Sequence, residues 1–147
     1  PASFRASGRA AGDPAQTRIT GVILDNSNVP IPGVTIRAVL NAQLTQNSSI
    51  IANATSVKTD AQGQFSVQPA PVGLVKLLVD GSTAQRQGTY PVLDYDTVTI
   101  AGQTNTLGMP IYMLPLNDAN KLCVTATTGG GTIAVPEAPG FSLTFGP

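Results

Sequence analysis

The residues best placed to do chemistry are two aspartates, Asp94 and Asp96, which flank Tyr95. In a β-strand, residues two apart lie on the same face, so both carboxylates would point the same way. Together with backbone carbonyl oxygens, such a pair makes a weak candidate Ca²⁺ site. The alternative is the exposed start of a strand beside a loop, where both carboxylates are hydrated. We favour this second interpretation, and the sequence predicts no metal and no cofactor.

A second run rich in oxygen ligands is Asp25-Asn26-Ser27-Asn28. It lacks the glycine and the closing glutamate of a calcium-binding loop. We therefore interpret it as a plain turn between two strands.

Nucleophilic catalysis has little support in the sequence. The single cysteine, Cys123, lies in an apolar run, and the chain contains no histidine that could act as its base. We expect a buried structural cysteine, with an intermolecular disulfide as the alternative. No serine stands in a Gly-x-Ser-x-Gly elbow, and Gly129-Gly130-Gly131 is not followed by Lys-Ser/Thr, so it predicts a hinge rather than a phosphate loop. The sequence predicts that the protein is not an enzyme.

Composition narrows the function classes further. The 147 residues include 8 Lys plus Arg and 8 Asp plus Glu, so the net charge is zero. A neutral chain has no electrostatic surface for nucleic acid or anionic lipid. No apolar run approaches the ~20 residues that span a bilayer, and no signal peptide opens the chain. Charged residues make up only 11%, and low charge with many Thr, Asn and Gly is typical of secreted or cell-surface bacterial proteins. Two Asn-x-Ser/Thr sequences, at Asn47 and Asn53, would carry sugar only in a glycosylating host.

The elements that must position these residues are short strands. Val, Ile and Thr are abundant, 15 Gly and 12 Pro supply turns, and no window has apolar residues at helical spacing. We expect strands at 18–25, 34–40, 50–59, 64–68, 74–79 and 95–100, an edge strand at best within 107–116, and short strands at 122–125, 132–135 and 141–145. The run 74–79 is expected to be buried on both sides along part of its length. Residues 101–106 are expected to form a polar turn and 82–94 an irregular connection.

These strands predict an all-β fold, an antiparallel β-sandwich with a short additional β segment at the C-terminus. The predicted core consists of Ile19, Ile23, Val34, Ile36, Phe65, Val67, Val75, Leu77, Val79, Val98 and Ile100. Three parts are expected: a linker or arm over 1–17, the sandwich over 18–116, and additional strands over 117–147 that begin a second β module.

Two stretches of turn residues are specific enough to suggest a family. Gly21-Val22-Ile23-Leu24-Asp25 leads through Pro30-Ile31-Pro32-Gly33-Val34 into a strand, and Thr59-Asp60-Ala61-Gln62-Gly63-Gln64-Phe65 leads to Pro71-Val72-Gly73 and an apolar strand. The segment 19–80 thereby resembles the carboxypeptidase regulatory-like family, a transthyretin-type β-sandwich of immunoglobulin-like architecture. A longer pattern, which includes 80–84, 90–93 and 110–113, resembles modules of very large secreted bacterial proteins with Ig-like domains or YD-type repeats. The resemblance implies a fold and is almost silent on function.

Three functions fit these observations. The first is a non-catalytic structural or adhesive module of a secreted or cell-surface protein, with neighbouring domains as its partners. The second is a self-assembling subunit of an extracellular fibre, in which the arm 1–16 or the alternating residues Phe141, Leu143 and Phe145 pair with the sheet edge of another copy. The third is a carbohydrate-binding module, which would need two or more of Tyr90, Tyr95 and Tyr112 exposed on one face.

Overall fold

Alternating apolar residues and turn residues produce a chain built from short strands. The structure is a computed structural model that describes residues 12–40, 54–121 and 129–146. In these described ranges, short 3₁₀ helices accompany the strands: η1 (Pro14–Gln16), η3 (Gly81–Thr83) and η4 (Asp118–Asn120). The strands are β1 (Arg18–Leu24), β2 (Thr35–Leu40), β3 (Ser56–Lys58), β4 (Gln64–Val67), β5 (Gly73–Asp80), β6 (Val92–Thr99), β7 (Thr104–Thr106), β8 (Ile111–Tyr112), β9 (Gly131–Ala134) and β10 (Ser142–Phe145).

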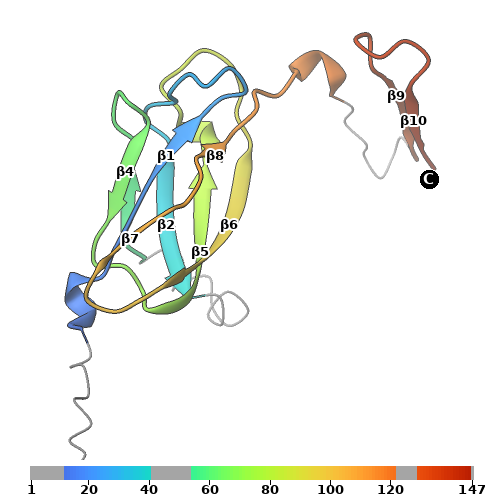
Figure 1. Cartoon of the computed structure of the whole chain (residues 1–147). Coiled ribbons are helices and arrows are strands. Elements are labelled where there is room, and N and C mark those ends of the chain that lie inside the picture. The colour runs from blue at the N-terminus through green and yellow to red at the C-terminus, as the bar shows by residue number, and fades with distance from the viewer. Residues whose placement is uncertain (1–11, 41–53, 122–128, 147) are drawn as a thin grey trace, which may run out of the picture.

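Two sheets face each other as a β-sandwich, which confirms the predicted fold class (Figure 1). One sheet has the order β3-β2-β5-β6 and is antiparallel throughout. The other has β1 at its centre, antiparallel to β4 but parallel to both β7 and β8. The second sheet is therefore mixed rather than purely antiparallel, because the chain crosses over from β6 and then runs beside β1 in the same direction.

The core lies between the two sheets and matches most of the prediction. Nine expected residues are buried in one cluster: Ile19, Ile23, Val34, Ile36, Phe65, Val67, Val75, Leu77 and Val79. Ile31, Ala38, Ala70, Tyr90, Ile111 and Met113 complete it.

The prediction is wrong for Val98 and Ile100, which are 63% and 62% exposed. Strand β6 pairs with β5 so that Leu93 lies opposite Val79 and Tyr95 lies opposite Leu77. This register turns the odd-numbered residues of β6 toward the core, so that Leu93 and Tyr95 pack against it. Val98 and Ile100 are even-numbered, so they lie on the outer face of the sheet.

Other strand bounds also differ from the expectation. Strand β6 begins at Val92, so part of the predicted irregular connection is regular strand. Strand β7 lies within the predicted polar turn, where its threonines pair with β1. Strand β5 buries alternate residues only, so one of its faces meets the core and the prediction of burial on both sides is wrong. Strand β8 has two residues and confirms an edge strand between the prolines. The predicted strand 122–125 lies outside the described residues.

Buried threonines fasten the loops to the sheets. Thr59 Oγ1 donates to the carbonyl of Ile31 at 2.7 Å and accepts from the N–H of Val34 at 2.9 Å. In the turn that follows, Asp60 Oδ1 accepts from the N–H groups of Gln62 and Gln64, which confirms the predicted Asp-Ala-Gln-Gly turn. The two hydrogen bonds of Thr59 satisfy backbone groups that would otherwise be buried without a partner.

The start of the described chain is also held to the sandwich. Thr17 is fully buried; its carbonyl accepts from the N–H of Ala70 at 2.9 Å and its hydroxyl accepts from the N–H of Gly102 at 3.0 Å. Residues 1–11 of the expected arm lie outside the described residues.

Candidate functional site

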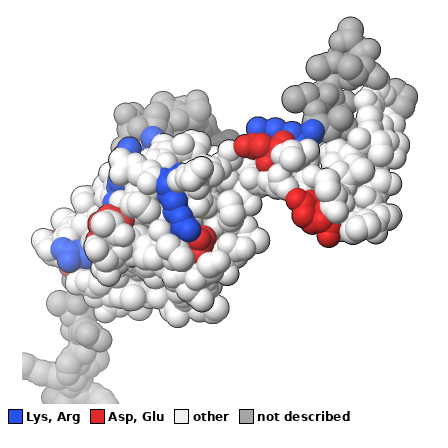
Figure 2. Space-filling model, turned by 90° about the horizontal axis from the view of Figure 1, so that it is seen from above, with Lys and Arg blue, Asp and Glu red and all other residues white. Residues whose placement is uncertain are grey.

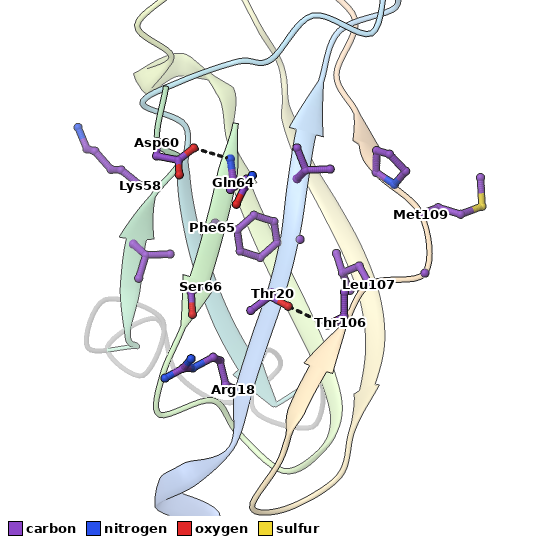
Figure 3. Close-up of a pocket in the computed structure, with 15 residues that line it drawn as sticks. Arg18, Thr20, Lys58, Asp60, Gln64, Phe65, Ser66, Thr106, Leu107 and Met109 are labelled. Atoms are coloured by element: carbon purple, nitrogen blue, oxygen red, sulfur yellow. Dashed lines mark hydrogen bonds between the residues drawn. The ribbon is translucent and has the colours of Figure 1, made fainter. Parts of the chain in front are cut away.

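The described surface has an open groove of about 730 Å³ over the sheet that contains β1. Figure 3 shows its floor, where the Phe65 ring lies between β4 and β1, with Lys58 and Asp60 on one side and Met109 on the other. The lining residues mix hydroxyl, amide and apolar groups: Arg18, Thr20, Gly21, Val22, Val57, Lys58, Asp60, Gln64, Phe65, Ser66, Thr106, Leu107, Gly108, Met109 and Pro110.

Several polar groups of this groove are already bonded within the protein. The hydroxyls of Thr20 and Thr106 lie 3.0 Å apart and hydrogen-bond to each other across β1 and β7. The guanidinium of Arg18 donates to Gln68 Oε1, and Asp60 holds its turn. The carboxylate of the groove, Asp60, thus accepts hydrogen bonds from the backbone of its own turn and none from a hydroxyl. The described lining of the groove therefore has no nucleophile–base pair.

The aspartates that sequence analysis singled out, Asp94 and Asp96, do share the outer face of β6. The ammonium of Lys76, on the neighbouring strand β5, lies 3.0 Å from Asp96 Oδ1 and 3.7 Å from Asp94 Oδ2. Its hydrogen bond to Asp96 is the main cause that raises the pKa of Lys76 above its ordinary value. A protein cation therefore lies where the Ca²⁺ hypothesis would place the metal. Among the described residues, no group of three His, Cys, Asp or Glu could hold a metal ion.

The run Asp25-Asn26-Ser27-Asn28 forms a turn, as interpreted. Asp25 is buried, and its Oδ1 accepts from the N–H groups of Ser27 at 2.7 Å and Val29 at 2.9 Å. Its second oxygen lies 2.7 Å from the guanidinium of Arg86. The hydrogen bond from Val29 is the main cause that holds the pKa of Asp25 below its ordinary value, and Ser27 and Arg86 act in the same direction. This carboxylate joins the turn after β1 to the loop after η3.

Acid should weaken this attachment. A carboxylate whose pKa is lower in the folded protein stabilises the fold above its unfolded pKa of 3.8, and this contribution is lost as the pH falls through the folded value. We expect Asp25→Asn to lower the melting temperature at neutral pH and the difference from the wild type to shrink below about pH 4. Thermal unfolding by circular dichroism between about pH 7 and about pH 3 measures this. Arg86→Gln should keep part of the pH dependence because the two backbone donors remain. A difference that stays constant over the whole range would contradict the assignment.

The tyrosines do not form an aromatic platform. Tyr90 is 5% exposed and belongs to the core, and Tyr95 is half-buried against it. Tyr112 is 43% exposed, and its hydroxyl donates to Asn28 Oδ1 at 3.0 Å. The condition for the carbohydrate-binding hypothesis, two or more tyrosines exposed on one face, is not met.

The predicted strand donors lie on the hairpin of β9 and β10. Phe141, Leu143 and Phe145 are each about half exposed, and Leu143 lies opposite Ile133. Gly129 and Gly130, from the glycine run before β9, have positive φ angles of 62° and 138°. Cys123 and the glycosylation candidates Asn47 and Asn53 lie outside the described residues, so their predicted roles stay predictions.

Sequence reasoning missed the cationic partners of these carboxylates. Lys76 is the one charged residue inside the apolar run of β5. A single charge in such a run indicates a side chain that points outward, where it can meet a residue of the next strand. Arg86 carried no such signal, because it lies in a loop. Asn105 was also missed; its side-chain amide bonds both backbone groups of Ile100.

Several charged residues of the described chain lie in pairs of opposite sign. Figure 2 shows acidic and basic side chains beside one another on a face that is otherwise uncharged. For example, Nζ of Lys121 lies 2.7 Å from Oδ1 of Asp118. This distribution agrees with the lack of an electrostatic surface expected from composition. The described residues also include no helix long and apolar enough to cross a membrane.

Neither a family model nor a curated protein matches the sequence. Among solved structures, the chain is similar to the Bacillus anthracis TIE protein (TM-score 0.47, 13% identity, 68% of this chain and 16% of that chain) and to a streptococcal ancillary pilin (0.47, 19%, 68% and 32%). It is also similar to a type II cohesin–X-dockerin complex from Acetivibrio cellulolyticus (0.44, 17%, 67% and 58%). The chain spans less than two thirds of each of these chains. With TM-scores below 0.5, these similarities assign it to none of their families.

Proposed function

We propose that this chain is a non-catalytic structural module of a secreted or cell-surface protein, which separates or presents its neighbouring domains. Residues 18–116 would form the module, a carboxypeptidase regulatory-like sandwich, and 117–147 would begin the next β unit. The turn motifs support the first assignment and the hairpin of β9 and β10 supports the second.

The observation that carries the proposal is the parallel pairing of the first and last strands of the sandwich. Strand β1 pairs with β7 at its beginning, where Arg18 lies opposite Thr104, and with β8 at its end, where Leu24 lies opposite Tyr112. The chain therefore enters at one end of the sandwich and leaves at the other, as Figure 1 shows. This geometry suits a module in a string of domains, because it places the neighbouring domains at opposite ends.

The same pairing determines how the sandwich responds to a load. When β1 and the strands parallel to it are pulled in opposite directions along their length, the hydrogen bonds between them are sheared together rather than opened one after another. The polar residues support this interpretation, because the buried hydroxyls of Thr17, Thr59 and Thr99 all bind loop backbone. These hydrogen bonds between buried hydroxyls and loop backbone thus make the sandwich more rigid.

Single-molecule pulling tests the proposal. In a Cys123→Ser chain, handles at Asp13 and Asn117 load β1 against β8 in shear, and we expect one cooperative unfolding event. As a control, handles at Asp13 and Gln103 separate β1 from β7 starting at one end, because Arg18 N–H donates to the carbonyl of Gln103 there. We expect the control geometry to unfold at a several-fold lower force. Equal forces in the two geometries would contradict a load-bearing role.

A further inference from the structure

Among the described residues, strand β6 has a free edge. It pairs with β5 on one side, and no strand of the described chain lies on the other. In an antiparallel pair of strands, alternate residue pairs exchange backbone hydrogen bonds. The N–H of Gly81 donates to the carbonyl of Pro91, so this pair, where β5 ends and β6 begins, is one of the hydrogen-bonded pairs. The odd-numbered residues of β6 therefore bond to β5. The even-numbered residues, Val92, Asp94, Asp96 and Val98, direct their N–H and C=O groups to the free edge.

At one end of this edge, a side chain makes the hydrogen bonds that a neighbouring strand would otherwise make. The amide of Asn105 accepts from the N–H of Ile100 at 2.9 Å and donates to the carbonyl of Ile100 at 3.2 Å. These two bonds are the ones that a neighbouring strand would make with Ile100. The edge is thus closed at Ile100 and open from Val98 back to Val92.

The open edge is bordered by apolar side chains on the outer face of the sheet. Val98 lies opposite Leu74 of β5, and both are more than half exposed, as is Ile100. Asp94 and Asp96 follow along the strand, but both lie beside the ammonium of Lys76. A charge normally protects a sheet edge from pairing, and here that charge is partly neutralised.

Another exposed apolar surface of the described chain is one face of the hairpin. Phe141, Leu143 and Phe145 share this face, and the opposite face is polar, with the hydroxyls of Thr132 and Thr144 3.0 Å apart. An isolated two-stranded hairpin is only marginally stable in water. Strand β10 itself carries no charge, so it brings no repulsion to the aspartates of β6.

We propose that the free edge of β6 receives strand β10 of a second copy of this chain. The donor lengthens the acceptor sheet, with Leu143 beside Val98. This inference rests on the proposed structural role and specifies the partner. A second copy is the occupant because Glu137, in the turn of the hairpin, accepts from Asn117 and Asn120 and so keeps the chain's own hairpin beyond the end of the sandwich (Figure 1). Because donor and acceptor are different surfaces, the contact repeats from copy to copy and forms an open chain of molecules.

Complementation between two variants, measured by light scattering, tests this pairing. We expect the mass of the wild-type chain to rise with concentration above 15.0 kDa. Val98→Lys removes the acceptor and Leu143→Lys removes the donor, so each variant alone should stay a single chain. An equimolar mixture should form a complex of two chains and nothing larger, because one intact acceptor meets one intact donor. Met109→Lys, at an exposed apolar residue away from both surfaces, should associate like the wild type.

Three results would overturn the inference. The first is a wild-type chain that stays at 15.0 kDa at every concentration. The second is association of Val98→Lys alone, which would show that hairpin pairs with hairpin. The third is a mixture that remains two separate chains although both variants keep the wild-type circular dichroism spectrum. A monomer that still resists shear would overturn this inference and leave the proposed function intact.

Discussion

Replacing Phe65 by alanine is expected to lower the free energy of unfolding by about 3–5 kcal/mol. The ring is 4% exposed and lies in the core beneath the backbone of its cross-strand partner Gly21. A Cβ at Gly21 would lie only 2.7 Å from Cζ of this ring, so the glycine makes room for it. Alanine would leave a cavity between the sheets that the paired strands cannot close. Chemical denaturation of the purified variant measures the loss.

Phe141→Ala is the matched control, because that phenylalanine is half exposed on the hairpin. We expect it to change the unfolding free energy of the sandwich by no more than about 0.5 kcal/mol. A loss below about 1 kcal/mol for Phe65→Ala would show that β4 does not turn this ring inward, and the register with β1 would then be wrong.

Gly63→Ala is the second substitution with a large expected effect, about 2–4 kcal/mol. Gly63 has a φ angle of +69°, in the left-handed region that residues with a Cβ rarely adopt. A Cβ there would also collide with the carbonyl oxygen of Ile23, a backbone atom that cannot move aside. The strands are held at this point by the 2.8 Å bond from Ile23 N–H to the carbonyl of Gly63. Relief of the collision would therefore break the start of the β1–β4 pairing.

Two other glycines calibrate this result. Gly108 has open space around its Cα and no positive φ, so Gly108→Ala should be close to neutral. Gly73 has a φ of +113° but also open space, so Gly73→Ala separates the backbone strain from the collision. Denaturant midpoints of the three variants should fall in the order Gly108→Ala, Gly73→Ala, Gly63→Ala, from most to least stable. A Gly63→Ala variant as stable as Gly108→Ala would refute the turn geometry.

Turn chemistry made much of the fold predictable. Asp60 and Gly63 are the residues that their turn requires, and Asp25 starts its own turn in the expected way. Strict alternation around Phe65 and Val67 identified the buried face of β4 correctly. In these segments the local pattern and the tertiary contacts agree.

Prediction failed where the apolar residues of a strand face the solvent. Val98 and Ile100 are more apolar than Thr99, yet Thr99 is buried and its hydroxyl binds the carbonyl of Pro71 at 2.6 Å. Which face of β6 is inward depends on its register with β5. That register comes from the connection 81–91, in which only the short 3₁₀ helix η3 is regular. Strand β7 was missed for a related reason, since its residues Thr104 to Thr106 become a strand only by pairing with β1.

The candidate sites were less predictable than the fold. The side-by-side placement of Asp94 and Asp96 followed from period two, but the nearness of Lys76 depended on a strand pairing that the sequence does not reveal. The bond between Arg86 and Asp25 joins two loops, and nothing local indicates it.

The central position of β1 also has a consequence for biosynthesis. Of the strands of the sandwich, β1 leaves the ribosome first, but its partners β7 and β8 are among the last. The hydroxyls of Thr20 and Thr106 meet across 86 residues of sequence. Closing so long a loop is slow, and it must happen before β1 can make its stabilising contacts with β7 and β8. The antiparallel strands β2, β5 and β6 can associate while β1 still lacks two neighbours. A nascent chain halted before Tyr112 should therefore remain sensitive to protease at β1, and protection should arise abruptly once β8 has emerged.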